Sequence, residues 1–124
     1  MRTILIVDDT PDVLSCLKLV LDRFGYDVMT AHDAESALSV IRGGPAVDLV
    51  ITDYQMPGMN GLELAGLLKR IVPSVPVILL SAYPGGDLCR KAQALGIDEY
   101  MQKPVNLQAF RGLVERVIKP SVHM

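Results

Sequence analysis

Short apolar runs, each followed directly by charged or hydroxyl-bearing residues, are the feature that most constrains how this chain folds. They are residues 4–7 followed by Asp8 and Asp9, residues 49–52 followed by Asp53, and residues 77–80 followed by Ser81. A fourth, more polar run, residues 99–102, is followed by Lys103. Runs of this length, bounded by turn residues and separated by helical patterns, are typical of the buried strands of a parallel sheet. The residues that follow them then collect at one edge of that sheet.

Amphipathic helical patterns separate these runs and a further short run. The predicted strands are residues 4–7, 28–31, 48–52, 77–80 and 98–102, and the predicted helices cover about residues 11–24, 34–42, 62–72, 88–95 and 107–117. Thr10, Asp33 and Asn106 stand where residues that cap helices are preferred. Leu95 and Leu107 are expected to face inward from the last two helices.

The alternation of strands and helices predicts a single α/β domain over residues 1–124 with right-handed crossovers. We expect a flavodoxin-like doubly wound (βα)5 fold whose parallel sheet has the strand order 2-1-3-4-5. In that order the chain reverses its winding direction between strands 1 and 3, and ligands bind at this reversal. Strands 1 and 3 are those that end in Asp8, Asp9 and Asp53, so topology selects the same acids as charge does.

Composition narrows the class of protein. The chain has 124 residues, half of them hydrophobic, and a net charge of −2. This balance gives no basic surface for nucleic acid and no polybasic anchor for a membrane. No apolar run approaches the roughly 20 residues that span a bilayer, and residues 4–7 are too few for a signal peptide. We therefore expect a cytoplasmic protein in which Cys16 and Cys89 stay reduced.

Three carboxylates in one crevice point to a divalent cation. Close carboxylate pairs repel by about 4 kcal/mol at an effective dielectric constant near 20, and Lys103 alone does not offset this. An all-oxygen site with room for water suits Mg²⁺. Because neighbouring residues of an extended strand point in opposite directions, we expect one of Asp8 and Asp9 to bind directly and the other to act through water.

This arrangement predicts phosphoryl chemistry. With Mg²⁺ bound, the Asp53 carboxylate can attack phosphorus and form an aspartyl phosphate. Lys103 would pair with one phosphoryl oxygen, and the Ser81 hydroxyl would donate a hydrogen bond to another.

These residues also carry a family resemblance. The segments that carry it are residues 4–9 (ILIVDD), 53–61 (DYQMPGMNG), 81–82 (SA) and 100–104 (YMQKP). In this order and spacing they resemble a two-component response-regulator receiver domain over essentially the whole chain.

The resemblance implies a role for each matching residue. Asp53 matches the phosphoacceptor, Asp8 and Asp9 the metal-binding acids, and Gln55 a ligand through its backbone carbonyl. Ser81 and Tyr100 match the switch residues that respond to phosphorylation, and Lys103 matches the lysine that precedes a cis proline, here Pro104.

The resemblance further implies partners and a change of shape. The phosphoryl donor would be a sensor histidine kinase or a histidine phosphotransfer protein, and the responding face would lie on the fourth helix, fifth strand and fifth helix. Dimerisation on phosphorylation stays open. Gln55 and Tyr83 border the approach of hydrolytic water and are expected to lengthen the phosphorylated lifetime.

Other functions fit the same residues less well. Taken singly, each acid could be a cap or a turn residue, Lys103 a surface charge and Tyr100 an edge-strand aromatic. A flavodoxin-type nucleotide binder would have its phosphate repelled by the acids of residues 8–12. A haloacid-type Mg²⁺ phosphatase needs a second carboxylate at position 10, where Thr10 stands. A pseudo-receiver that binds proteins without being phosphorylated is disfavoured by the complete set of acids, hydroxyl and lysine.

Overall fold

A computed structural model describes residues 2–44, 46–82, 86–97 and 99–118 of the chain. Its strands are β1 (Thr3–Val7), β2 (Asp27–Ala31), β3 (Leu49–Asp53), β4 (Val77–Ser81) and β5 (Glu99–Gln102). Its helices are α1 (Pro11–Arg23), α2 (Ala34–Gly43), α3 (Gly61–Ile71), α4 (Gly86–Ala94) and α5 (Leu107–Ile118). The strands form one parallel sheet in the order β2-β1-β3-β4-β5, which confirms the predicted doubly wound fold.

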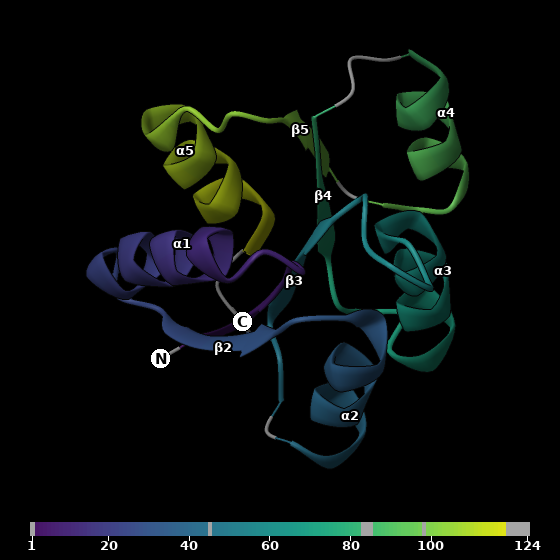
Figure 1. The fold of residues 1–124 in the computed structure, drawn as a ribbon, viewed down its shortest axis with the longest axis horizontal. Helices are drawn as coiled ribbons and strands as arrows, with labels where there is room; N and C mark the ends of the chain where they lie inside the picture. Colours follow the sequence, from purple (N-terminus) through teal and green to yellow (C-terminus); the bar gives the residue numbers. More distant parts are fainter. Residues whose placement is uncertain (1, 45, 83–85, 98, 119–124) are drawn as a thin grey trace, which may run out of the picture.

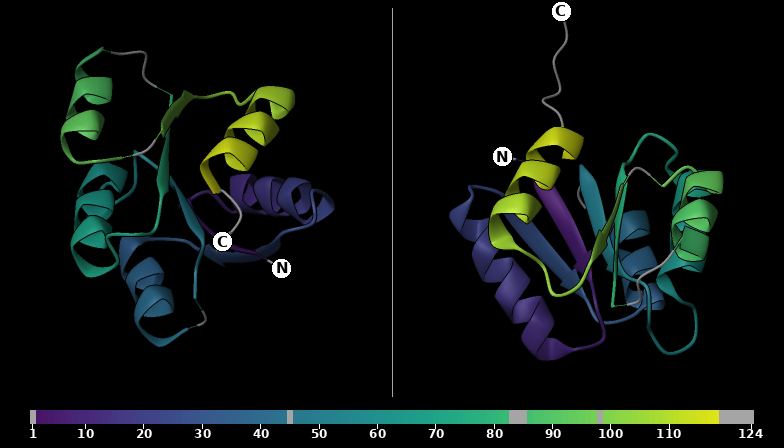
Figure 2. Two further views of the ribbon diagram at one scale, coloured as in Figure 1. Left: turned by 180° about the vertical axis from the view of Figure 1, so that it is seen from behind. Right: turned by 90° about the horizontal axis from the view of Figure 1, so that it is seen from above.

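Helices cover both faces of the sheet. Figures 1 and 2 show α1 and α5 on one face and α2, α3 and α4 on the other. The central strands β1, β3 and β4 are almost wholly buried, whereas the edge strands β2 and β5 are partly exposed. Strands buried on both faces must be apolar throughout, which explains the continuous apolar runs in the sequence.

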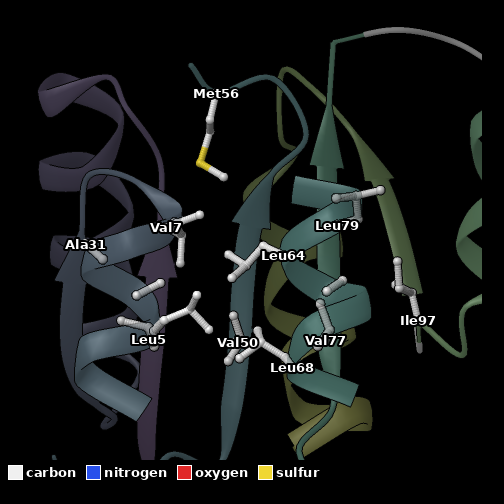
Figure 3. Packing of buried hydrophobic residues seen from close by; sticks show 14 of the residues in the cluster. Leu5, Val7, Ala31, Val50, Met56, Leu64, Leu68, Val77, Leu79 and Ile97 are labelled. Atoms are coloured by element: carbon white, nitrogen blue, oxygen red, sulfur yellow. The ribbon is translucent and has the colours of Figure 1, made fainter. Parts of the chain in front are cut away.

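Alternate residues of each central strand enter different cores. Leu5, Val7 and Val50 belong to the core beneath α2, α3 and α4, part of which Figure 3 shows. Ile6 and Ile51 face the other way, into the core beneath α1 and α5. Burying this apolar area, at about 25 cal/mol per Å², is the main stabilising contribution to the fold.

The predicted caps of α2 and α5 are confirmed. The Asp33 carboxylate accepts a hydrogen bond from the backbone N–H of Ser36 at 2.7 Å, and the Asn106 side chain accepts one from Ala109 at 3.0 Å. Thr10 occupies the cap position of α1, but its side chain makes no capping hydrogen bond.

Two leucines predicted to face inward do not. Leu95 is 42% exposed because α4 ends one residue before it, at Ala94. Leu107 is 51% exposed at the first residue of α5, and the buried stripe of that helix begins at Phe110. Helical periodicity places a residue on a face but does not tell where the helix meets the sheet. Tyr83, predicted to border the path of water, lies outside the described residues.

The reversal of winding lies between β1 and β3. These strands pair directly, with Val7 opposite Thr52. Continuing the pairing by one residue sets Asp8 level with Asp53. The register thus brings two of the predicted acids to one place. Among the described residues, no helix has the length and apolar character needed to cross a membrane.

Candidate phosphoryl and metal site

Three aspartates converge at the carboxyl ends of β1 and β3. Asp8, Asp9 and Asp53 each offer a carboxylate oxygen, and these oxygens lie within 4.8 Å of one another. Asp8 and Asp53 are buried, at 1% and 7% exposure, whereas Asp9 is exposed. Asp8 and Asp9 differ in burial, yet their carboxylate oxygens lie in one cluster. Direct binding by one of them, with the other acting through water, stays a prediction. Strand β1 ends at Val7, so the alternation of an extended strand does not continue through the two acids.

Backbone hydrogen bonds fix Asp8 in this cluster. Its N–H donates to the carbonyl of Ala31 at the end of β2, at 3.1 Å. One of its carboxylate oxygens, Oδ1, accepts a hydrogen bond from the N–H of Thr10 at 2.9 Å. The other oxygen, Oδ2, faces Lys103. A buried carboxylate needs such partners, because a charge without them is strongly destabilising.

Lys103 joins Asp8 and Asp53. Its Nζ lies 3.1 Å from Oδ2 of Asp8 and 3.0 Å from Oδ1 of Asp53. Its backbone N–H donates to the carbonyl of Ser81 at 2.7 Å, which ties the end of β5 to the end of β4. The peptide bond between Lys103 and Pro104 is cis, as the resemblance implied. Residues separated by more than 90 positions in the sequence thus meet in one ion cluster.

Burial and neighbouring charges both shift pKa values in this cluster. Burial raises the pKa of Asp53, the charges of Asp8 and Asp9 act in the same direction, and Lys103 opposes them without prevailing. Burial by itself would lower the pKa of Lys103, but hydrogen bonds and attraction to Asp53 and Asp8 prevail and raise it. The two directions are consistent, because Lys103 meets two anions whereas Asp53 meets one cation and two anions. The cluster therefore keeps an excess of negative charge.

The other predicted site residues differ in how deeply they are buried. Ser81 is buried at the end of β4, at 1% exposure. Gln55 is exposed in the loop after β3, where it lines a depression of about 450 Å³ together with Asp9, Met56 and Asn60. Tyr100, on β5, is partly buried and packs against the core beneath α2, α3 and α4.

The structure adds supporting residues to which the sequence reasoning gave no role. Asn60 and Glu63 form a reciprocal capping box at the start of α3: the Asn60 side chain accepts from the N–H of Glu63 at 2.8 Å, and Glu63 accepts from the N–H of Asn60 at 2.9 Å. Gly61, the first residue of α3, packs against the backbone of Asp53. The pattern of Asn followed by Glu three residues later was the available signal for this cap.

The fold and the site together define a class of protein. It is a doubly wound α/β domain in which a cluster of aspartates suited to a divalent cation, paired with a lysine, lies where the winding of the chain reverses between β1 and β3. Comparison with known proteins supplies the family, because residues 4–115 match the response regulator receiver domain. The chain belongs to this family, whose members are the receiver domains of two-component signal transduction.

Curated relatives agree with this assignment. The chain is 40% identical over 107 residues to the response regulator GtcR of Aneurinibacillus migulanus, a match that covers 85% of this chain and 43% of that protein. It is 34% identical over 122 residues to the transcriptional regulatory protein CpxR of Escherichia coli (strain K12), covering 98% and 51%. The chain thus spans about half the length of these two relatives.

Solved structures share the fold. The chemotaxis protein CheY4 of Vibrio cholerae has a TM-score of 0.89 at 26% identity, covering 94% of this chain and 98% of that one. The response regulator TrrA of Thermotoga maritima, solved in complex with Mg²⁺-BeF, has a TM-score of 0.85 at 37% identity with the same coverage.

Proposed function

We propose that Asp53 is the phosphoacceptor of this receiver domain. The observation that carries the proposal is the position of its carboxylate, which lies among the acids of β1 and 3.0 Å from the ammonium group of Lys103. A carboxylate so placed can attack phosphorus while the lysine neutralises charge on the transferred group. The domain would be a signalling switch that catalyses only its own phosphorylation and dephosphorylation.

Magnesium is the cofactor that suits this site. Asp8, Asp9 and Asp53 supply oxygen ligands, and the backbone carbonyl of Gln55 is proposed as a further one. Hard oxygen ligands in a partly open depression suit Mg²⁺, which retains several waters in its coordination sphere. When bound, the cation would offset the negative charge of the acids and of the incoming phosphate.

The proposed reaction is a transfer between two side chains. An oxygen of Asp53 forms a bond to the phosphorus of a phosphohistidine, and the bond between phosphorus and nitrogen breaks, with the electron pair remaining on the imidazole. Lys103 and the Ser81 hydroxyl would stabilise the transferred oxygens. Water later attacks the phosphorus, the bond between phosphorus and the Asp53 oxygen breaks, and inorganic phosphate leaves, which restores the Asp53 carboxylate.

The switch would reach the surface through Ser81 and Tyr100. A phosphoryl group adds charge and strong hydrogen-bond acceptors next to Ser81 and would draw its hydroxyl inward. Tyr100 would then change its packing, and the face formed by α4, β5 and α5 would change with it. Strands β4 and β5 pair directly, with Ser81 opposite Gln102 and Leu79 opposite Tyr100, so a shift at Ser81 would reach Tyr100 through the paired strands.

The partners follow from this reaction. The proposed phosphoryl donor is a sensor histidine kinase or a histidine phosphotransfer protein, and the proposed place is the cytoplasm. We propose that residues 1–124 form one receiver domain. Dimerisation on phosphorylation would use the face that the switch alters.

The proposal is tested by labelling. The protein is incubated with Mg²⁺ and a small acyl phosphate, and its intact mass is measured before and after treatment with hydroxylamine. We expect one phosphoryl adduct that hydroxylamine removes, and no adduct in the Asp53→Asn variant. Labelling that persists in the variant would assign the acceptor to another residue, and a parent protein that takes no adduct would favour the pseudo-receiver.

A further inference from the structure

The start of α3 lies very close to the end of β3. A methyl group built on the Cα of Gly61 would lie 2.1 Å from the carbonyl oxygen of Asp53, 2.9 Å from its carbonyl carbon and 3.0 Å from the Cα of Tyr54. Real Cβ atoms essentially never approach other atoms within 3.0 Å. All three neighbours are backbone atoms, so no flexible side chain could move aside. Gly61 is therefore needed for space, next to the residue proposed to accept phosphate.

Backbone conformation does not explain this glycine. The described glycines with positive φ are Gly25, Gly58 and Gly96. Gly61 is not among them, and it begins a regular helix. An alanine at position 61 would thus be compatible with the local backbone of α3, and its methyl group would meet the backbone of Asp53 and Tyr54.

Hydrogen bonds hold both sides of this contact. On the side of β3, the N–H of Tyr54 donates to the carbonyl of Leu80 at 2.8 Å, and the hydroxyl of Thr52 donates to the carbonyl of Asp53 at 3.1 Å. Thr52 is fully buried, so water cannot replace its hydroxyl. The end of β3 is therefore fixed against β4 and by its own preceding residue.

The side of α3 is equally constrained. The N–H of Gly61 donates to the carbonyl of Tyr54 at 2.8 Å, and the capping box of Asn60 and Glu63 fixes the residues around it. A methyl group at position 61 would have to push the carbonyl oxygen of Asp53 away by about 0.9 Å to reach 3.0 Å. With both sides held, the displacement passes to the backbone that carries the Asp53 carboxylate and the Gln55 carbonyl.

We propose that Gly61 is a positioning residue for phosphoryl acceptance, and that the hydroxyl of Thr52 supports the same carbonyl group. Together they set where the backbone of Asp53 lies, and hence where its carboxylate meets Mg²⁺ and the phosphoryl donor. The inference rests on the proposed function of Asp53. A misplacement of about 1 Å can slow a positioned reaction by about a hundredfold.

Two matched pairs of variants test the inference. Gly61→Ala is compared with Gly66→Ala in the same helix, where an added methyl would meet only the side chain of Leu95 at 4.0 Å. Thr52→Val, which removes the hydroxyl at nearly constant volume, is compared with Thr52→Ser, which keeps it. Three quantities are measured on each folded protein: Mg²⁺ affinity by calorimetry, the amide resonances of residues 53–55, and the rate of phosphorylation by an acyl phosphate.

We expect Gly61→Ala to weaken Mg²⁺ binding about tenfold and to slow phosphorylation at saturating Mg²⁺ by tenfold to a hundredfold, with shifted amide resonances at residues 53–55. Gly66→Ala should match the parent in all three. Thr52→Val should weaken Mg²⁺ binding several-fold, and Thr52→Ser should stay near the parent. A merely structural role would lower the melting temperature without changing the affinity of the folded protein for Mg²⁺.

Equal Mg²⁺ affinities and equal rates in Gly61→Ala and Gly66→Ala would overturn the proposal. If Gly61→Ala does not fold, the comparison of Thr52→Val with Thr52→Ser tests the proposal. Equal Mg²⁺ affinities and equal phosphorylation rates in these two variants would overturn it. The outcome is separable from that of the proposed function. A parent that binds Mg²⁺ but takes no phosphoryl group contradicts the role of Asp53, while calorimetry and amide resonances still test whether Gly61 and Thr52 position the site.

Discussion

Replacing the proposed phosphoacceptor should stabilise the metal-free protein. At an effective dielectric constant near 20, carboxylate oxygens within 4.8 Å repel by at least about 3 kcal/mol, and an ammonium group at 3.0 Å attracts by about 5 kcal/mol. The desolvation of the buried Asp53 carboxylate costs a few kcal/mol more. Repulsion from Asp9 costs less, because Asp9 is exposed and water screens its charge. Repulsion and desolvation together slightly exceed the attraction to Lys103, so the charge of Asp53 modestly destabilises the folded protein. We expect Asp53→Asn to raise the free energy of unfolding by about 1 to 2 kcal/mol at pH 7 without Mg²⁺.

The pH dependence of this gain follows from the pKa of Asp53. Burial raises that pKa in the folded protein above its ordinary value of 3.8. A raised carboxyl pKa contributes stability below the unfolded value, and this stability is lost as the pH rises through the folded value. The asparagine variant has no such loss. Its advantage over the parent should therefore grow as the pH rises through the folded pKa of Asp53 and should vanish as the pH falls towards 3.8.

Urea unfolding at several pH values, in EDTA and in Mg²⁺, provides the measurement. Mg²⁺ at about 100 times its dissociation constant should add about 2.7 kcal/mol to the free energy of unfolding of the parent. It should add less to that of Asp53→Asn, which lacks one ligand, so the difference in stability between the two proteins should shrink or change sign. The exposed Asp12 gives a matched control, and Asp12→Asn should change stability by no more than about 0.5 kcal/mol. A parent more stable than Asp53→Asn at pH 7 in EDTA would refute the reasoning, because it would mean that Lys103 outweighs burial and repulsion.

Three further predictions concern the switch, the cap and the core. Lys103→Ala should uncouple phosphorylation from conformational change, because the charge that meets the phosphoryl group is gone; equal NMR shifts on phosphorylation in variant and parent would contradict this. Asn60→Ala should lower the free energy of unfolding by about 1 kcal/mol through loss of the capping box, measured in urea, and an unchanged midpoint would rule out the cap as a source of stability. Phe110→Ala should destabilise by about 3 to 5 kcal/mol, because Phe110 is a fully buried side chain that α5 contributes to the core, and a loss under 1 kcal/mol would mean that the core refills the space.

Much of the fold was predictable because its signals are local. Runs such as residues 77–80 are apolar on both faces, which only a strand covered by helices on both sides tolerates. Asp33 and Asn106 cap helices through atoms a few residues away, so short sequence windows contain the information. Leu95 and Leu107 were misplaced because the end of a helix and its angle to the sheet depend on packing that periodicity does not describe.

The sequence by itself determined which residues stand at the carboxyl ends of the strands, since strand boundaries and charge are properties of neighbouring residues. It thereby selected Asp8, Asp9, Asp53 and Lys103 as one group. Only the tertiary structure decided that Lys103 pairs with both Asp8 and Asp53, and that Gly61 must leave room for the carbonyl of Asp53. The physical reason is distance along the chain: ion pairs and close backbone approaches between separate elements depend on register, burial and packing, which arise only when those elements meet.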